Sequence, residues 1–246
     1  MDRFVTHEVA ADVTVRVGRA MPELPAVVER EVERLWQVAA RRVAAGGAGS
    51  MFNGRVFSAD AITPHCVTGH LTEYRRVIAQ IERPELFATL GLRALAVCGV
   101  LCCAGGVVLG QRHRAAVYQP GMWQTAPAGS VDAEAVAADG TVDLRRQLLS
   151  ELQEELGLSS AATGTPRPLC IIEHPANHVA DLGLALTSYL NAEAILAAHR
   201  NTGNGEYEQV VVVPGTELSA FLAKRGEKLA PSAAEFLIRA GLICQI

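Results

Sequence analysis

Apolar residues recur along the chain with two spacings, and the spacing predicts which segments are strands and which are helices. Residues 12–18 alternate polar and apolar side chains, as a half-buried strand does. Val28, Val32 and Leu35 instead form an apolar stripe within a helix predicted over residues 22–44. In the rest of the N-terminal third, the same criterion predicts a strand at residues 52–58, a helix at 71–81 and a short helix at 84–92.

From residue 93 onward the apolar segments predict a denser mixture of strands and helices. They indicate a hairpin of residues 94–103 and 107–112, strands at 123–126, 169–173, 184–190 and 208–214, and helices at 141–156, 192–199, 217–224 and 231–240. Because strands and helices interleave irregularly, we expect an α/β fold with a mixed sheet between helical layers. Residues 1–90 are expected to form an α/β extension packed on the second part, residues 91–246, because no long polar linker separates the two.

Composition and charge narrow the classes of function. The formal net charge is −4, which argues against a nucleic-acid binder that relies on a basic surface. The six cysteines include no Cys-x-x-Cys pair, so we expect buried free thiols and a reducing compartment. These features favour a cytoplasmic protein that acts on a small molecule.

The stretch that most resembles a membrane span is residues 94–110, which carries no charged side chain. It is slightly short for a transmembrane helix, and Gly105 and Gly106 interrupt it. Two buried strands joined by a tight turn explain it better. The first eight residues also lack an apolar signal core, so we expect no membrane association.

The predicted helix at residues 141–156 places acidic side chains where an ordinary helix would not. At about 100° per residue, Glu155 projects into the leucine stripe, Glu151 lies at its edge and Glu154 lies about 60° beyond Glu151. Glutamates three and four residues apart repel each other, and the C-terminal half of a helix disfavours anions. A divalent cation such as Mg²⁺ would offset these costs. The alternative is a solvated acidic face, with Arg145 and Arg146 as counter-charges.

A short motif in the same helix resembles a known family signature. Residues 150–158 read Ser-Glu-Leu-Gln-Glu-Glu-Leu-Gly-Leu and resemble the end of the Nudix box, R-E-U-x-E-E-x-G-U with U aliphatic, at every specified position except Ser150. Residues 123–132 resemble the W-x-x-P-A-G-x-V-D segment of nucleotide-sugar members, with one extra residue between Trp and Pro. The resemblance covers about residues 91–215 and implies a Nudix-like α/β/α sandwich.

Two departures from the family pattern bear on rate and metal count rather than on fold. Gly129 lies twenty-two residues before Glu151, where the box usually has fifteen, so a seven-residue insertion is expected around residues 132–140. The upstream glutamate of the box is absent or replaced by Asp143. The missing arginine normally orients a box glutamate, and Arg146, one turn before Ser150, is a candidate substitute.

By this resemblance, Glu151, Glu154 and Glu155 hold Mg²⁺, or alternatively Mn²⁺, on the pyrophosphate of a substrate. Glu151 is then a metal ligand or the general base. Some family members take the base from a later loop, for which Glu206 and Glu208 are candidates; the alternative for these two is a solvated strand end.

Four further residues are predicted to contact substrate. Arg112 and Arg114 follow the hairpin and are placed to clamp phosphate, or else are ordinary loop residues. Gly129 belongs to the motif segment, and Trp123 either stacks on a base or packs in the core.

A loop near the predicted cleft carries three further polar candidates. His174 and His178 are candidate catalytic acids or hydrogen-bonding loop residues. A zinc site formed by the two histidines with Asp181 is the less favoured interpretation.

The implied activity is hydrolysis of a small-molecule nucleoside diphosphate derivative. The segments around residues 52–57 and 71–75 resemble the extension of the UDP-glucose/UDP-galactose diphosphatase branch, which implies a UDP-sugar cleaved to UMP and sugar 1-phosphate. The alternatives are ADP-ribose, a dinucleotide or coenzyme A as substrate, and a Nudix-like nucleotide-binding module with weakened catalysis. A homodimer is compatible with the resemblance, because many relatives dimerise.

Overall fold

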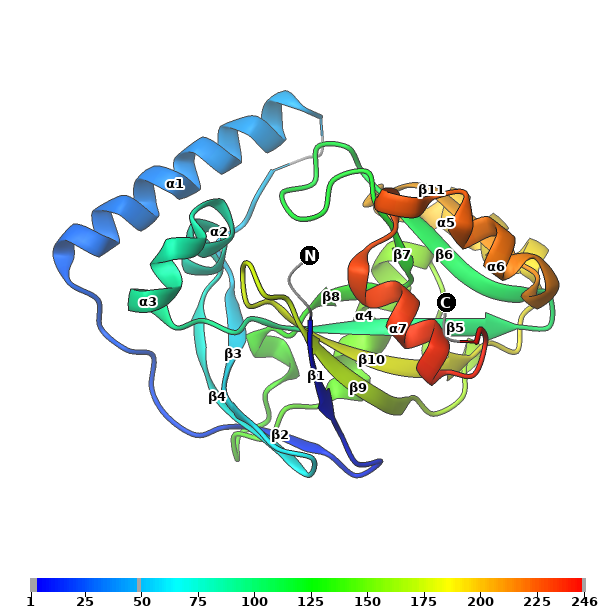
Figure 1. Cartoon of the computed structure of the whole chain (residues 1–246), viewed down its shortest axis with the longest axis horizontal. Coiled ribbons are helices and arrows are strands. Elements are labelled where there is room, and N and C mark those ends of the chain that lie inside the picture. Colours follow the sequence, from blue (N-terminus) through cyan, green and yellow to red (C-terminus); the bar gives the residue numbers. More distant parts are fainter. Residues whose placement is uncertain (1–3, 48–49, 245–246) are drawn as a thin grey trace.

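A mixed sheet of eight strands forms the centre of the protein, in a computed structural model that describes residues 4–47 and 50–244 (Figure 1). Its six-strand path runs β1 (Val5–Glu8), β9 (Arg167–Glu173), β10 (Ala180–Thr187), β5 (Leu95–Cys103), β6 (Gly106–Arg112) and β11 (Tyr207–Val213). Two short strands complete it: β7 (Trp123–Thr125) beside β6 and β8 (Ala128–Ser130) beside β5. Strands β10 and β5 are parallel, whereas the other pairs are antiparallel.

Helices cover both faces of this sheet. Leucines of α4 (Leu144–Leu156) and Ile195 of α5 (Ala192–Thr202) pack in one apolar core, together with Leu182 of β10. Residues of α6 (Gly215–Ala223) and α7 (Pro231–Arg239), including Leu218 and Phe236, pack in a second core with Leu109 of β6. The arrangement is an α/β/α sandwich with a mixed sheet, as the sequence predicted.

Helix α4 begins and ends at residues that favour helix termini. The Asp143 side chain accepts a hydrogen bond from the backbone N–H of Arg146, and Gly157 ends the helix at φ 68°. The helix begins at Leu144 rather than at residue 141 as predicted, because the residues just before it form backbone hydrogen bonds with the N-terminal part of the chain. The backbone N–H of Val142 donates to the carbonyl oxygen of Val15.

The N-terminal part forms a second, smaller sheet flanked by helices, at the left of Figure 1. Its strands are β2 (Thr14–Val17), β4 (Cys66–Glu73) and β3 (Arg55–Ile62), in that order. Its helices are α1 (Ala26–Ala45), α2 (Tyr74–Glu82) and α3 (Phe87–Leu90), the last preceded by a 3₁₀ turn at Pro84–Leu86. Strand β1 was not predicted, and it belongs to the large sheet through its pairing with β9. The first eight residues were predicted to lack a signal sequence, and three of them, residues 1–3, lie outside the described residues.

The sequence prediction of a helix over residues 71–81 was wrong at its first turn. Residues up to Glu73 continue β4, which pairs with both β2 and β3, and α2 begins only at Tyr74. Residues 71–73 pair with Phe57, Val56 and Arg55 of β3, and this strand pairing decides their conformation over local helical spacing.

The segment predicted as an insertion joins the N-terminal part to the large sheet. The backbone N–H of Phe57 donates to Val131, and that of Val17 donates to Gly140. Between these points lies the 3₁₀ helix η2 (Ala133–Ala135), capped by the side chain of Asp132. The extra residues therefore provide a backbone edge on which the N-terminal sheet docks.

The uncharged stretch at residues 94–110 is the hairpin of β5 and β6, as predicted. No helix among the described residues is long and apolar enough to cross a membrane. The six cysteines are free thiols.

The side-chain amide of Gln80 connects the N-terminal part to the rest of the protein, and its replacement should therefore lower stability. Gln80 of α2 donates to the carbonyl oxygens of Leu92 and Asn177 and accepts from the backbone N–H of Leu92. Gln80→Leu would leave these backbone groups buried without partners, at about 3 kcal/mol in the free energy of unfolding. Urea denaturation measures this loss, and Gln37→Leu on the exposed face of α1 is the matched control. Equal midpoints for the two variants would contradict the docking role.

Candidate functional site

A cavity of about 680 Å³ lies between the N-terminal part and the large sheet. Its walls from the N-terminal part include Asn53, Val56, Tyr74 and Val77, and its walls from the sheet side include Ala96, Arg112, Gly129, Glu151, Asp181 and Glu206. A second pocket, lined by residues that include Arg146 and Ser150, contains none of the buried carboxylates. The large cavity is therefore the candidate functional site.

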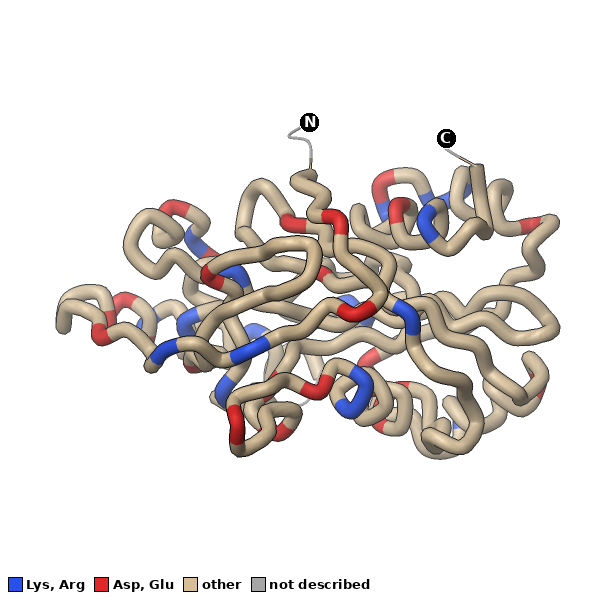
Figure 2. Tube along the Cα trace, turned by 90° about the horizontal axis from the view of Figure 1, so that it is seen from below, with Lys and Arg blue, Asp and Glu red and all other residues tan. Residues whose placement is uncertain are grey.

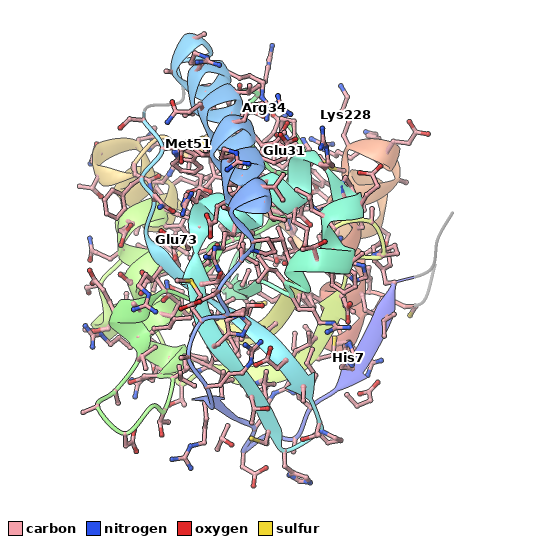
Figure 3. The ribbon with its side chains drawn as sticks, turned by 90° about the vertical axis from the view of Figure 1, so that its left-hand side faces the viewer. His7, Glu31, Arg34, Met51, Glu73 and Lys228 are labelled. Carbon is pink, nitrogen blue, oxygen red and sulfur yellow. The ribbon has the colours of Figure 1, made fainter. Side chains whose placement is uncertain are left out.

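The N-terminal wall of the cavity is held by an ion-pair network. Asn53 accepts a hydrogen bond from the backbone N–H of Arg75, whose guanidinium pairs with Glu29 on α1 at 2.9 Å and with Glu73 at 2.8 Å. Glu73, labelled in Figure 3, lies at the junction of β4 and α2. Helix α1, which carries the labelled Glu31 and Arg34, thus fixes the cavity wall without lining it.

Glu151 of α4 enters the cavity directly against the backbone of β8. A Cβ atom at Gly129 would lie 2.0–2.5 Å from the carboxylate atoms of Glu151, so only glycine leaves room for this contact. The carboxylate also accepts a hydrogen bond of 2.8 Å from Gln147. Burial, together with the negative charges of Glu206 and then Glu154, raises the pKa of Glu151 to about 8, although the hydrogen bond from Gln147 lowers it.

Glu155, one turn after Glu151, is fully buried beneath β8. Its Oε2 atom accepts hydrogen bonds of 2.9 Å from the backbone N–H of Ala128 and from the hydroxyl of Tyr207. Its Oε1 atom has no hydrogen-bond partner among the described residues. Burial raises the pKa of Glu155 well above its ordinary value, and the charges of Glu206 and Glu151 add to this effect.

Glu206 and Arg112 line the same cavity as Glu151. The guanidinium of Arg112 lies 3.2 Å from Glu206 and donates a 3.0 Å hydrogen bond to the carbonyl oxygen of Tyr118. Glu206 precedes Glu154 among the charges that raise the pKa of Glu151, although Glu154 is on the same helix. We call Glu151, Glu155 and Glu206 the acidic centre: Glu151 and Glu206 line the cavity, Glu155 is fully buried, and the charge of Glu206 raises the pKa of both α4 glutamates.

Glu154 does not join this centre. Its side chain is exposed and accepts a 2.9 Å hydrogen bond from the hydroxyl of Ser150. Among the described residues, no three His, Cys, Asp or Glu side chains are grouped closely enough to hold a metal ion. The predicted convergence of Glu151, Glu154 and Glu155 is absent here because the helical phase of Glu154 turns it away from the stripe that the other two follow.

Glu208 and Arg114 also lie outside the cavity lining. They pair with each other at 3.1 Å, and the Arg114 side chain is 82% exposed. The register of β11 shifts between Tyr207 and Gln209, which interrupts the alternation of side chains along the strand. Because of this bulge, Glu206 and Glu208 have different surroundings. Glu206, which precedes β11, lines the cavity, whereas Glu208, within β11, does not.

Trp123 packs in the core rather than in the cavity. It is 4% exposed and makes an edge-to-face contact with Phe221, with ring centroids 5.2 Å apart. Arg225 lies over the Trp123 ring at 4.9 Å. Of the two roles that the sequence left open for Trp123, the structure supports the packing role.

A second polar group in the cavity was only partly visible in the sequence. Asp181 of β10 lines the cavity, and its Oδ2 atom receives hydrogen bonds from His174 at 2.8 Å and from Ser232 of α7 at 2.7 Å. His178 turns away from this pair and bonds to Glu173 at 2.7 Å. The two histidines therefore do not share Asp181, as the zinc interpretation required.

In the view of Figure 2, acidic and basic positions are interspersed along the trace. The cavity lining, in contrast, contains five carboxylates (Asp132, Glu134, Glu151, Asp181 and Glu206) and two guanidinium groups, Arg55 and Arg112. This excess of negative charge favours a ligand that brings a cation with it.

No protein-family model matches the chain, and no curated protein matches it by sequence. Solved structures that match include a Nudix hydrolase from Nitrosomonas europaea, with 12% identity, 60% of this chain and 88% of that chain covered, and a TM-score of 0.42. A Nudix-family hydrolase from Clostridium perfringens matches with 11% identity, coverage of 61% and 95%, and a TM-score of 0.40.

A third match is a bifunctional NMN adenylyltransferase/ADP ribose pyrophosphatase from Francisella tularensis, complexed with AMP and a Mn ion. It has 11% identity and a TM-score of 0.44, and the match covers 65% of this chain and 44% of that chain. Because these identities and scores are low, the function is inferred from the site itself.

The buried glutamates predict how stability depends on pH. Glu151 has a raised pKa in the folded protein, so its contribution to stability is complete below about pH 4.5 and is lost as the pH rises towards about 8. We expect the metal-free protein to lose on the order of 3–5 kcal/mol across this window. Urea denaturation in EDTA measures it. Glu151→Gln should flatten the profile and the exposed Glu154→Gln should not; identical profiles would contradict the burial effect.

Proposed function

We propose that the protein is a Nudix-type hydrolase that cleaves the pyrophosphate of a nucleoside diphosphate derivative with the help of a divalent cation. The observation that carries this proposal is the acidic centre: Glu151 and Glu155 on consecutive turns of α4, with Glu206 and Arg112 lining the same cavity as Glu151. The Nudix-like motif of residues 150–158 is the segment of α4 that supplies both α4 glutamates.

The residues of the acidic centre fit a divalent cation. Their carboxylate oxygens are the hard ligands that Mg²⁺ prefers, and Mn²⁺ accepts the same donors. Glu155 has a buried oxygen with no partner among the described residues, and the charge of Glu206 raises the pKa of both Glu151 and Glu155. Glu151 would hold the ion from the cavity surface and Glu155 from beneath. Substrate oxygens and water would complete its coordination, since the protein offers no preformed three-ligand group within the described residues.

The bound cation would lower the pKa of a coordinated water and offset charge on the phosphoryl oxygens. The chain itself supplies the other functions. Arg112 is placed to bind a phosphate oxygen, with its guanidinium already oriented by Glu206 and by the Tyr118 carbonyl oxygen. Glu206 is the proposed general base for the attacking water, because it lines the cavity whereas Glu208 does not.

The proposed substrate class is a nucleoside diphosphate sugar, with a UDP-sugar as the specific candidate and UMP and sugar 1-phosphate as products. Phe52 is 82% exposed at the cavity wall of the N-terminal part, where an aromatic ring is available to stack on a base. ADP-ribose has the same chemical organisation and stays the alternative substrate. The free thiols fit a reducing compartment such as the cytoplasm.

One observation favours a second candidate, a nucleotide-binding module with weakened catalysis. Glu154 bonds to Ser150, which stands where the family pattern has arginine, and it faces away from the acidic centre. If Glu154 is needed for the cation, this arrangement lowers turnover while leaving the cavity intact.

Variants of the four glutamates test the proposal. We expect Glu151→Gln and Glu206→Gln each to lower kcat by at least about 100-fold, because both line the cavity and act on the reacting water or the cation. Glu154→Gln and Glu208→Gln should lose less than about tenfold, because they lie outside it. The measurement is ³¹P NMR of products with Mg²⁺ and UDP-sugars, ADP-ribose, dinucleotides and coenzyme A. Binding without turnover across this panel would establish the binding module instead.

Gly129 offers a test that separates site geometry from stability. In Gly129→Ala the new methyl group would overlap the Glu151 carboxylate, which can rotate away because it ends a flexible side chain. We expect kcat/KM to fall about 10- to 100-fold while Tm changes by only a few degrees. Gly215→Ala, where a Cβ meets open space, is the control. Unchanged turnover in Gly129→Ala would show that the contact between Gly129 and Glu151 has no catalytic role.

A further inference from the structure

The cavity lining contains a second polar group besides the acidic centre. Asp181 of β10 is in register with Ala96 of β5, which is itself opposite Ser130 of β8. Cross-strand partners point to the same face of a sheet, so the Asp181 side chain stands in a row of small neighbours. All three residues line the cavity, and Asp181 is the one of the three that carries a carboxylate.

The hydrogen bonds of Asp181 leave one of its oxygens free for a ligand. His174 and Ser232 both bond to Oδ2, and Oδ1 has no hydrogen bond to any described residue. The three side chains are buried, so the orientation of the carboxylate is fixed by the protein rather than by solvent. His174 and Ser232 do not line the cavity themselves. They are positioning residues that hold Asp181 with one oxygen directed towards the cavity.

Tyr118 supplies a second unpartnered group at the same place. It lines the cavity, and its ring packs edge-to-face on His174, with centroids 5.9 Å apart. Its hydroxyl is buried without a hydrogen bond of normal geometry among the described residues, and the Asn177 side chain lies near it. A buried hydroxyl without a partner costs about 1–3 kcal/mol, which a bound ligand would recover.

The backbone around this group is also held in unusual conformations. Gln119, next to Tyr118, has φ 49°, and His178, in the loop that follows His174, has φ 59°. These are the two non-glycine residues with positive φ in the part of the chain that the structure describes. Such conformations persist where the surrounding structure enforces them, often at ligand sites.

The chemistry of this group selects its ligand. The basic side chains of the cavity lining are Arg55 and Arg112, and Arg112 is already assigned to the acidic centre and a phosphate. A carboxylate oxygen accepts hydrogen bonds, and a tyrosine hydroxyl both donates and accepts. Ala96, Cys98 and Val179 add small apolar surfaces beside them. A neutral ligand with several hydroxyl groups and C–H faces matches this set, and a further phosphate does not.

We propose that Asp181 and Tyr118 form a hydroxyl-binding subsite that takes the sugar attached to the distal phosphate of the substrate. The inference rests on the proposed function, because it assumes that the diphosphate lies at Arg112. Arg112 joins the two places: its guanidinium pairs with Glu206 and donates to the carbonyl oxygen of Tyr118. In this proposal the sugar lies next to the bound diphosphate and meets Asp181 and Tyr118.

The test compares three probes with Mg²⁺: UDP-glucose, the UDP ester of a simple alkyl alcohol, and UDP-glucose with a 2′,3′-dideoxyribose. For UDP-glucose we expect Tyr118→Phe to lower kcat/KM about 2- to 10-fold and Asp181→Asn about 10- to 100-fold, mainly through KM. The dideoxy probe should show the same losses, and the alkyl ester should show none. Ser232→Ala should lower kcat/KM less than Asp181→Asn does, and only for UDP-glucose and the dideoxy probe.

Matched controls separate recognition from folding. Tyr189→Phe removes a hydroxyl from a tyrosine that is 73% exposed and outside the cavity lining, and Ser188→Ala removes a buried hydroxyl elsewhere. Both should leave kcat/KM unchanged on all three probes. If Asp181→Asn does not fold, Tyr118→Phe still decides the outcome, because its ring is retained.

Each result has a distinct meaning for the two proposals. Equal losses on UDP-glucose and the alkyl ester, with none on the dideoxy probe, would place the nucleoside ribose at the subsite and overturn the sugar assignment. No loss on any probe would overturn the subsite while leaving the hydrolase standing. If the wild-type protein turns over none of the probes, calorimetric binding of the same three ligands tests the subsite alone. Equal affinity for UDP-glucose and the alkyl ester would then overturn it.

Discussion

The site depends on keeping several carboxylates close together in a place that water reaches poorly. Burying a carboxylate costs several kcal/mol unless hydrogen bonds or opposite charges offset the loss of hydration. Ala128 and Tyr207 provide the bonds to Glu155, and Arg112 provides the charge near Glu206. These groups come from β8, β11 and the end of β6, so the placement of the α4 glutamates depends on strands of the large sheet.

The N-terminal part completes this site by closing the cavity on its open side. Its docking depends on residues 131–142, whose backbone pairs with β2 and β3. In the sequence these residues are a departure from the family pattern. In the structure they are the edge that receives the N-terminal sheet. The insertion and the extension are thus physically dependent on each other, and the cavity exists because both are present.

The sequence predicted the sandwich and the inward direction of Glu155 because both follow from periodicity. Periodicity gives the angle of a side chain on its own helix but does not identify the neighbours that it meets. Glu154 was therefore grouped with Glu151, although its partner is Ser150. The choice between Glu206 and Glu208 depended on a bulge in β11, which no local pattern in the sequence indicates. The pairing of Asp181 with Ser232 joins residues 51 positions apart and needed the tertiary structure.

Because of the charges in the cavity, the binding of the cation and the binding of the substrate depend on each other. A diphosphate would bring further negative charge beside Glu151, Glu155 and Glu206, with Arg112 as the nearest guanidinium. Opposite charges at about 4 Å interact by about 4 kcal/mol at an effective dielectric constant of about 20, and like charges repel by the same amount. One arginine cannot offset both the carboxylates and the phosphates. A divalent cation changes the sign of this balance, so it and the diphosphate should each bind more tightly in the presence of the other. A neutral sugar at Asp181 would add binding energy without adding charge. Its binding would therefore need no further basic side chain in that part of the cavity.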